Sequence, residues 1–135
     1  MSKIKSALQM VDEANAAIEC IDVCDAQKLS DDDGVLFVDI RDIRELWREG
    51  TIPGAISAPR GMLEFWMDPT CKYFKQDFAS DRKLVFFCAS AWRSALAVKA
   101  LQDMGFEHIS HLSGGFSAWK KAGLAVEKVE PRKKK

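Results

Sequence analysis

The chain has 135 residues, of which 47% are hydrophobic and 30% charged, with 20 Lys and Arg against 20 Asp and Glu. This length and composition are typical of a single globular domain, and the formal net charge of zero provides no overall field to recruit nucleic acid or a membrane. No apolar stretch is long enough to cross a bilayer, and the N-terminus has no charged-then-apolar leader pattern, so we expect a cytoplasmic protein.

Periodicity along the chain predicts strands that alternate with helices. The expected strands are short runs rich in β-branched and aromatic residues: 21–23, 35–38, 55–57, 84–87 and 108–112. The expected helices have apolar residues at helical spacing: 2–18, 25–29, 43–48, 62–66, 93–104 and 116–122. A longer loop is expected over 68–80. Such alternation predicts a parallel sheet with helices on both faces.

The four cysteines have neither the spacing of a disulfide framework nor that of a zinc site: Cys20, Cys24, Cys71 and Cys88. We therefore expect free thiols and no metal. Cys71 lies in the expected loop and is a candidate to form a disulfide with Cys88 after oxidation. No glycine-rich phosphate-binding signature is present, since the Gly114-Gly115 pair lacks the lysine of a P-loop.

One cysteine stands at a position suited to a nucleophile. Cys88 follows an apolar strand and precedes a helix-patterned stretch, so its thiol lies where a strand turns into a helix. The first turn of a helix has unpaired N–H groups and partial positive charge, which stabilise a thiolate. Arg93 adds a positive charge at the far end of the turn. The alternative interpretation is that Cys88 is a small buried hydrophobe.

Three ordered segments resemble the rhodanese (sulfurtransferase) family. Residues 88–94 resemble its active-site loop, in which a Cys, four residues and an Arg-Ser lie between a strand and a helix. Residues 38–56 resemble its Asp-x-Arg strand end and Gly-His-Ile-Pro-Gly-Ala turn, and residues 105–119 its closing segment. The resemblance implies a rhodanese-like α/β fold with a central five-stranded parallel sheet, helices on both faces and the loop at the C-terminal edge.

The expected domain organisation follows from the extent of this resemblance. A rhodanese-like domain is expected over 20–126. It is preceded by an N-terminal helical extension at 1–19 and followed by a basic C-terminal tail at 127–135, which is expected to be solvated.

The resemblance also implies a rhodanese-type (thiosulfate:cyanide) sulfurtransferase. Cys88 would attack the outer sulfur of thiosulfate or another donor, hold it as a persulfide and pass it to a thiol, to cyanide or to a protein sulfur acceptor. The backbone N–H groups of the loop would bind the anionic sulfur. The chemistry that the resemblance implies requires no metal, flavin, nucleotide or other cofactor. The loop residues are Ala89, Ser90, Ala91, Trp92, Arg93 and Ser94.

Three residues outside the loop are expected to support the site. Asp39 and Arg41 follow the strand at 35–38, and for Asp39 we favour a structural role, accepting loop N–H groups or pairing with an arginine, over a catalytic one. Arg60 is a candidate for the pocket mouth, where it would attract an anion. Its alternative is a solvated surface arginine.

Two other functions stay open at this point. A cysteine phosphatase or arsenate reductase also uses a Cys-loop-Arg at a helix start, but such enzymes place five residues between Cys and Arg, where this chain has four, and tend to have a histidine where Phe87 stands. A non-catalytic sulfur-carrier or interaction module is kept open by three departures from the family pattern. Ala91 replaces the usual loop glycine, Trp92 is bulky, and Thr51 replaces the common histidine of the turn.

Overall fold

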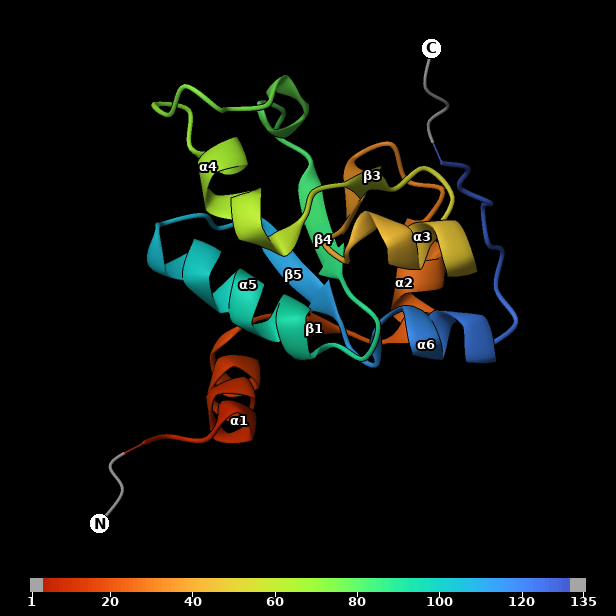
Figure 1. Ribbon diagram of the computed structural model, residues 1–135, viewed down its shortest axis with the longest axis horizontal. Helices are drawn as coiled ribbons and strands as arrows, with labels where there is room; N and C mark the ends of the chain where they lie inside the picture. The colour runs from red at the N-terminus through yellow and green to blue at the C-terminus, as the bar shows by residue number, and fades with distance from the viewer. Residues whose placement is uncertain (1–3, 132–135) are drawn as a thin grey trace.

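The computed structural model describes residues 4–131 as one β-sheet between two groups of helices (Figure 1). All strand pairs are parallel, and the strand order is β1-β5-β4-β2-β3. The strands are β1 (Cys20–Ile21), β2 (Val35–Asp39), β3 (Ile56–Ser57), β4 (Lys83–Phe87) and β5 (Ile109–Leu112). The five-stranded parallel sheet predicted from the sequence is therefore confirmed.

Helices cover both faces of the sheet. They are α1 (Ala7–Ala17), α2 (Val23–Leu29), α3 (Ile43–Glu49), α4 (Leu63–Met67), α5 (Trp92–Asp103) and α6 (Gly115–Lys121), with short 3-10 turns η1 (Arg60–Met62) and η2 (Gln76–Phe78). Figure 1 shows α4 and α5 on one side of the sheet, α1 outside α5, and α2, α3 and α6 on the other side. This arrangement buries the three central strands, as expected for a parallel sheet.

Alternate side chains of the central strands divide the core into two parts. Val38 and Phe86 lie in the cluster formed with α4 and α5, whereas Phe37, Val85 and Trp119 lie in the cluster formed with α2 and α6. A third, smaller cluster holds α1 against α5. Neighbouring residues of a strand point to opposite faces, so the near-continuous apolar runs in the sequence are the runs buried on both sides.

Helix caps explain two differences from the predicted elements. The helix expected over 2–18 begins at Ala7, because the Ser6 side chain accepts a hydrogen bond from the Gln9 N–H at 3.1 Å. Residues 2 and 3 lie outside the described residues. The strand expected at 21–23 ends at Ile21, because Asp22 caps α2, which includes Val23. The assignment of Val23 to a strand was therefore wrong.

The segment after α6 returns to the body of the domain. Trp119 Nε1 donates to the Ala125 carbonyl at 2.7 Å, and Thr51 and Glu127 form an isolated antiparallel bridge. These contacts attach residues 125–127 beside the turn that follows α3. Residues 132–135 of the expected tail lie outside the described residues. Within residues 4–131 no helix combines the length and the apolar character needed to cross a membrane.

Candidate active site

The carboxyl ends of β2 and β4 meet at one edge of the sheet. Asp39 ends β2 and pairs in register with Phe87, the last residue of β4, and the Ile40 N–H donates to the Phe87 carbonyl at 3.0 Å. Cys88 is the next residue of the chain and is 1% exposed. The edge where ligands bind in open α/β sheets therefore carries the thiol.

The loop after Cys88 turns sharply at Ala91. Ala91 has φ 76° and ψ 0°, and it is the one residue other than glycine with positive φ among those that the structure describes. An alanine in this left-handed conformation costs about 1–2 kcal/mol. Ala91 thus adopts a left-handed backbone conformation for which glycine is better suited.

The first turn of α5 directs an N–H group at the sulfur. Helices α1, α2 and α3 have their first turns capped by the side chains of Ser6, Asp22 and Asp42, but α5 starts after Ala91, which has no side-chain acceptor. The Ser94 N–H instead donates to Cys88 Sγ at 3.3 Å. A thiolate at this position receives both a hydrogen bond and the favourable end of the helix dipole.

Ser94 and His111 extend this contact into the interior. The Ser94 hydroxyl oxygen lies 3.6 Å from Cys88 Sγ and 2.9 Å from Nδ1 of His111 in β5. Both residues are buried. Burial lowers the pKa of His111 to about 4, so its imidazole is neutral at neutral pH.

The start of α6 holds the start of the loop. The Phe116 N–H donates to the Cys88 carbonyl at 2.8 Å, and the Ser117 N–H donates to the Ala89 carbonyl at 3.0 Å. This close approach requires glycine at position 115, because a Cβ atom there would lie 2.5 Å from the Ala89 carbonyl oxygen. The Gly114-Gly115 pair therefore positions the backbone that carries the nucleophile.

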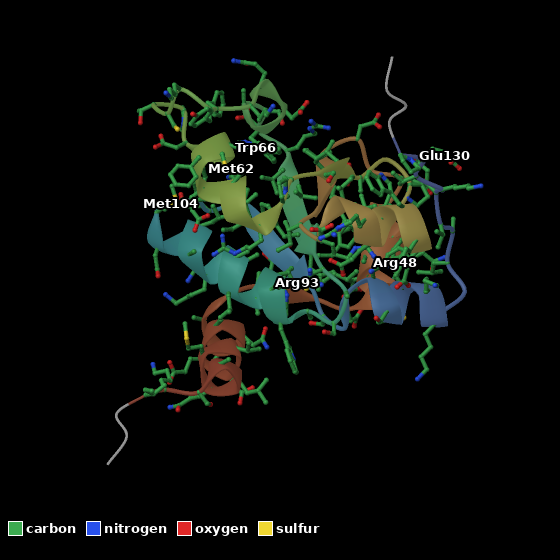
Figure 2. All side chains as sticks on the ribbon, in the orientation of Figure 1. Arg48, Met62, Trp66, Arg93, Met104 and Glu130 are labelled. Carbon is green, nitrogen blue, oxygen red and sulfur yellow. The ribbon has the colours of Figure 1, made fainter. Side chains whose placement is uncertain are left out.

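Arg93 is held by α3. Its guanidinium makes two hydrogen bonds to the Glu45 carboxylate, at 2.8 and 3.0 Å, at the amino end of α5 (Figure 2). The Arg93 guanidinium lowers the pKa of Glu45 below its ordinary value. Since Glu45 also accepts from the Asp42 N–H in the capping box of α3, Arg93 connects two elements and shares its charge with a carboxylate.

Asp39 and Arg41 form a buried ion pair beneath the turn that follows α3. Arg41 donates to both Asp39 carboxylate oxygens, at 3.0 and 2.7 Å, and to the Gly50 carbonyl at 2.7 Å. Thr51 Oγ1 donates to Asp39 at 2.8 Å, and the Arg41 guanidinium lies 4.4 Å from the centre of the Phe116 ring. The pairing of Asp39 with an arginine is the contact expected of a structural carboxylate, and the role of Asp39 stays a prediction.

Trp92, Arg60 and Cys71 take no part in the contacts described above. The Trp92 side chain is 56% exposed beside the loop. Arg60 pairs with Glu64 of α4 at 2.8 Å. All four cysteines are free, and Cys71 lies in the turn after α4, so its pairing with Cys88 stays a prediction. Across residues 4–131, no group of three His, Cys, Asp or Glu side chains is arranged to hold a metal ion.

Four residues that build this site were not predicted as site residues from the sequence: Glu45, Thr51, His111 and Gly115. The capping box Asp42-x-x-Glu45 was a readable signal for Glu45, but its contact to Arg93 spans 48 residues. Thr51 was noticed only as a departure from the family pattern. His111 gave no signal, because a histidine inside an apolar strand is read as core.

Known proteins resemble this chain in sequence and structure. A family model described as rhodanese-like domain matches residues 22–122. A sulfurtransferase of Allochromatium vinosum is 33% identical over 101 residues, which cover 75% of this chain and 86% of that protein. A polysulfide-sulfur transferase homodimer from Wolinella succinogenes matches with a TM-score of 0.70 and 29% identity, covering 89% of this chain and 85% of that one.

A further solved structure is more similar. It is a protein of unknown function from Rhodopseudomonas palustris, described as a possible tyrosine phosphatase. It matches with a TM-score of 0.89 and 48% identity over 94% of this chain and 98% of that one.

Proposed function

The chain belongs to the rhodanese-like domain family, and we propose that it is a sulfurtransferase in which Cys88 carries a sulfane sulfur as a persulfide. The observation that carries the proposal is the contact between Cys88 Sγ and the first turn of α5, where the Ser94 N–H lies 3.3 Å from the sulfur. That contact stabilises a thiolate, which is the nucleophile this chemistry requires.

The reaction proceeds in two half-reactions. The Cys88 thiolate attacks the outer sulfur of thiosulfate, a new S–S bond forms, and the original S–S bond breaks with its electron pair leaving on sulfite. The persulfide then carries a negative charge on its terminal sulfur, which loop N–H groups between Ala89 and Ser94 bind. A thiolate or cyanide attacks that terminal sulfur and returns Cys88 to the thiolate, so no redox partner is needed. A protein thiol is an acceptor of the same chemical class.

Two features make phosphate-ester hydrolysis the weaker proposal, although one similar protein is described as a possible tyrosine phosphatase. The loop encloses four residues between Cys88 and Arg93, where cysteine phosphatases have five. Arg93 makes two hydrogen bonds to the Glu45 carboxylate. A phosphatase needs that guanidinium for a tetrahedral oxyanion, so binding phosphate here would first break a two-bond ion pair.

The test compares two assays on purified protein, thiosulfate:cyanide sulfur transfer and aryl phosphate hydrolysis. The unmodified protein should form thiocyanate. Cys88→Ser should abolish this activity, while the control Cys71→Ser should retain it. Hydrolysis of the phosphate ester without sulfur transfer would support the phosphatase function instead. Failure of both reactions in a folded protein would favour the non-catalytic module.

A further inference from the structure

His111 is a buried polar residue to which the reaction above assigns no part. It is 1% exposed, and its Nε2 atom has no hydrogen-bond partner among the residues that the structure describes. Its other ring nitrogen lies 2.9 Å from Ser94 Oγ, which in turn lies 3.6 Å from Cys88 Sγ. Buried polar side chains are normally fully partnered, so a half-satisfied imidazole linked to a nucleophile suggests a role.

The protonation of His111 Nδ1 controls where the Ser94 hydroxyl hydrogen points. The Ser94 hydroxyl has one hydrogen and three neighbours: Cys88 Sγ, the Ala91 carbonyl oxygen at 3.4 Å, and His111 Nδ1. If Nδ1 lacks a proton, it accepts a hydrogen bond from the Ser94 hydroxyl, because this contact is the shortest of the three. If Nδ1 carries the proton, it donates to Ser94, and the hydroxyl hydrogen is free to point at a sulfur anion.

The surroundings favour the second arrangement. A protonated Nε2 would be a buried donor without an acceptor, whereas an unprotonated Nε2 is a buried acceptor without a donor. Buried N–H donors without a partner are rarer in proteins than buried acceptors without a partner, so the unprotonated state of Nε2 is favoured. Burial also lowers the pKa of His111 to about 4, so the ring holds a single proton at neutral pH. With that proton on Nδ1, Ser94 can accept from a Cys88 thiol and donate to a Cys88 thiolate without any change in the ring.

Other groups near the two residues add little competing charge. In the sheet, His111 has Cys20 of β1 and Phe86 of β4 as register partners, and neither is charged in its ordinary state. Near Cys88, the charged side chains are already paired as Arg93 with Glu45 and Asp39 with Arg41. A change at His111 therefore acts on Cys88 chiefly through Ser94.

We propose that His111 is a positioning residue: its neutral, Nδ1-protonated imidazole donates to Ser94 and so directs the Ser94 hydroxyl hydrogen to the anionic sulfur of Cys88 or of its persulfide. The inference rests on the proposed function only in taking Cys88 as the nucleophile.

The test is the pH profile of Cys88 alkylation by iodoacetamide, followed by peptide mass so that the other cysteines do not interfere. Ser94→Ala removes the hydroxyl and should move the midpoint upward by roughly half to one pH unit, the worth of one hydrogen bond. His111→Leu removes only the N–H that orients this hydroxyl, which can then also turn to the Ala91 carbonyl, so it should move the midpoint upward by less than Ser94→Ala does. The double variant should shift no further than Ser94→Ala alone. His111→Asn places an amide N–H near the position of Nδ1 and should stay close to the unmodified protein.

His111→Gln provides a second test in case the His111→Leu variant does not fold. His111→Gln keeps a polar side chain of similar size but carries its amide near the position of Nε2, so it should shift the midpoint as leucine does. An unchanged midpoint in the folded leucine or glutamine variant, or shifts that add in the double variant with Ser94→Ala, would overturn the proposal. Alkylation needs no sulfur donor, so this result is independent of whether the protein transfers sulfur.

Discussion

Replacing Gly115 by alanine should separate the nucleophile loop from the helix that holds it. The new Cβ atom would lie 2.5 Å from the Ala89 carbonyl oxygen and 2.7 Å from the Cys88 carbonyl oxygen, so backbone must move by about 1 Å to reach ordinary contact. That movement weakens the two hydrogen bonds from α6 to Cys88 and Ala89, which contribute about 0.5–1.5 kcal/mol each.

The expected loss of stability combines three terms. Alanine at φ +63° costs about 1–2 kcal/mol of strain, and loss of the two hydrogen bonds costs about 1–3 kcal/mol. The reduced entropy of the unfolded chain offsets about 0.5–1 kcal/mol, which leaves a net loss of about 1–4.5 kcal/mol. Gly123→Ala is the matched control: its φ is +77°, and a Cβ atom there meets nothing within 4 Å. Only the strain and the unfolded-chain entropy then apply, with a net loss of about 0–1.5 kcal/mol.

Urea unfolding of both variants measures the difference, and sulfur transfer measures its consequence for Cys88. Because catalysis depends on placement within a fraction of an ångström, Gly115→Ala should also lower the transfer rate by about a hundredfold in protein that remains folded, whereas Gly123→Ala should not. Equal stability losses in the two variants would refute the argument that α6 positions the loop.

Three further changes test other parts of the site. Thr51→Val removes the hydroxyl that donates to the buried Asp39 carboxylate and should lower the free energy of unfolding by about 1–3 kcal/mol. The control Thr70→Val removes a hydroxyl that donates to the exposed Asp68 carboxylate and should lower it by less, as urea titration of both variants would measure. The pKa of His111 is about 4 in the folded protein against about 6.5 in the unfolded chain, so the folded state favours the neutral imidazole. The contribution of His111 to the free energy of unfolding is therefore complete above pH 6.5 and falls by about 3 kcal/mol as the pH drops to 4. His111→Asn should remove this pH dependence, as urea titrations at each pH would measure. Inserting one glycine between Ala91 and Trp92 should move the loop N–H groups away from the bound sulfur and lower the rate of thiosulfate:cyanide transfer roughly a hundredfold. Circular dichroism would confirm that the variant is folded, and an unchanged transfer rate would show that loop size does not matter.

The fold was predictable because local patterns and tertiary structure agree. Apolar runs such as 35–38 and 84–87 are buried on both faces, and the family predicted from three ordered segments is confirmed by the match over residues 22–122. The errors lie at element ends. Asp22 and Ser6 decide where α2 and α1 begin, and a capping side chain competes with the periodicity that predicted a strand or a longer helix.

The candidate site was predictable only in its local part. Cys88 and the helix start are adjacent in the chain, so the strand-loop-helix pattern was enough to find them. Contacts made across the sheet edge leave no local trace: Glu45 meets Arg93, and His111 meets Ser94, over separations of 48 and 17 residues. The left-handed conformation of Ala91 also departs from what its residue type favours, since the contacts around it outweigh the local preference.

Intact mass after incubation with thiosulfate tests the central claim most directly. The unmodified protein should gain the mass of one sulfur atom on Cys88 and lose it again on addition of cyanide, and Cys71→Ser should behave in the same way. Cys88→Ser should gain nothing. A folded protein that gains no mass, or a Cys88→Ser variant that still takes up the sulfur atom and releases it to cyanide, would contradict the account.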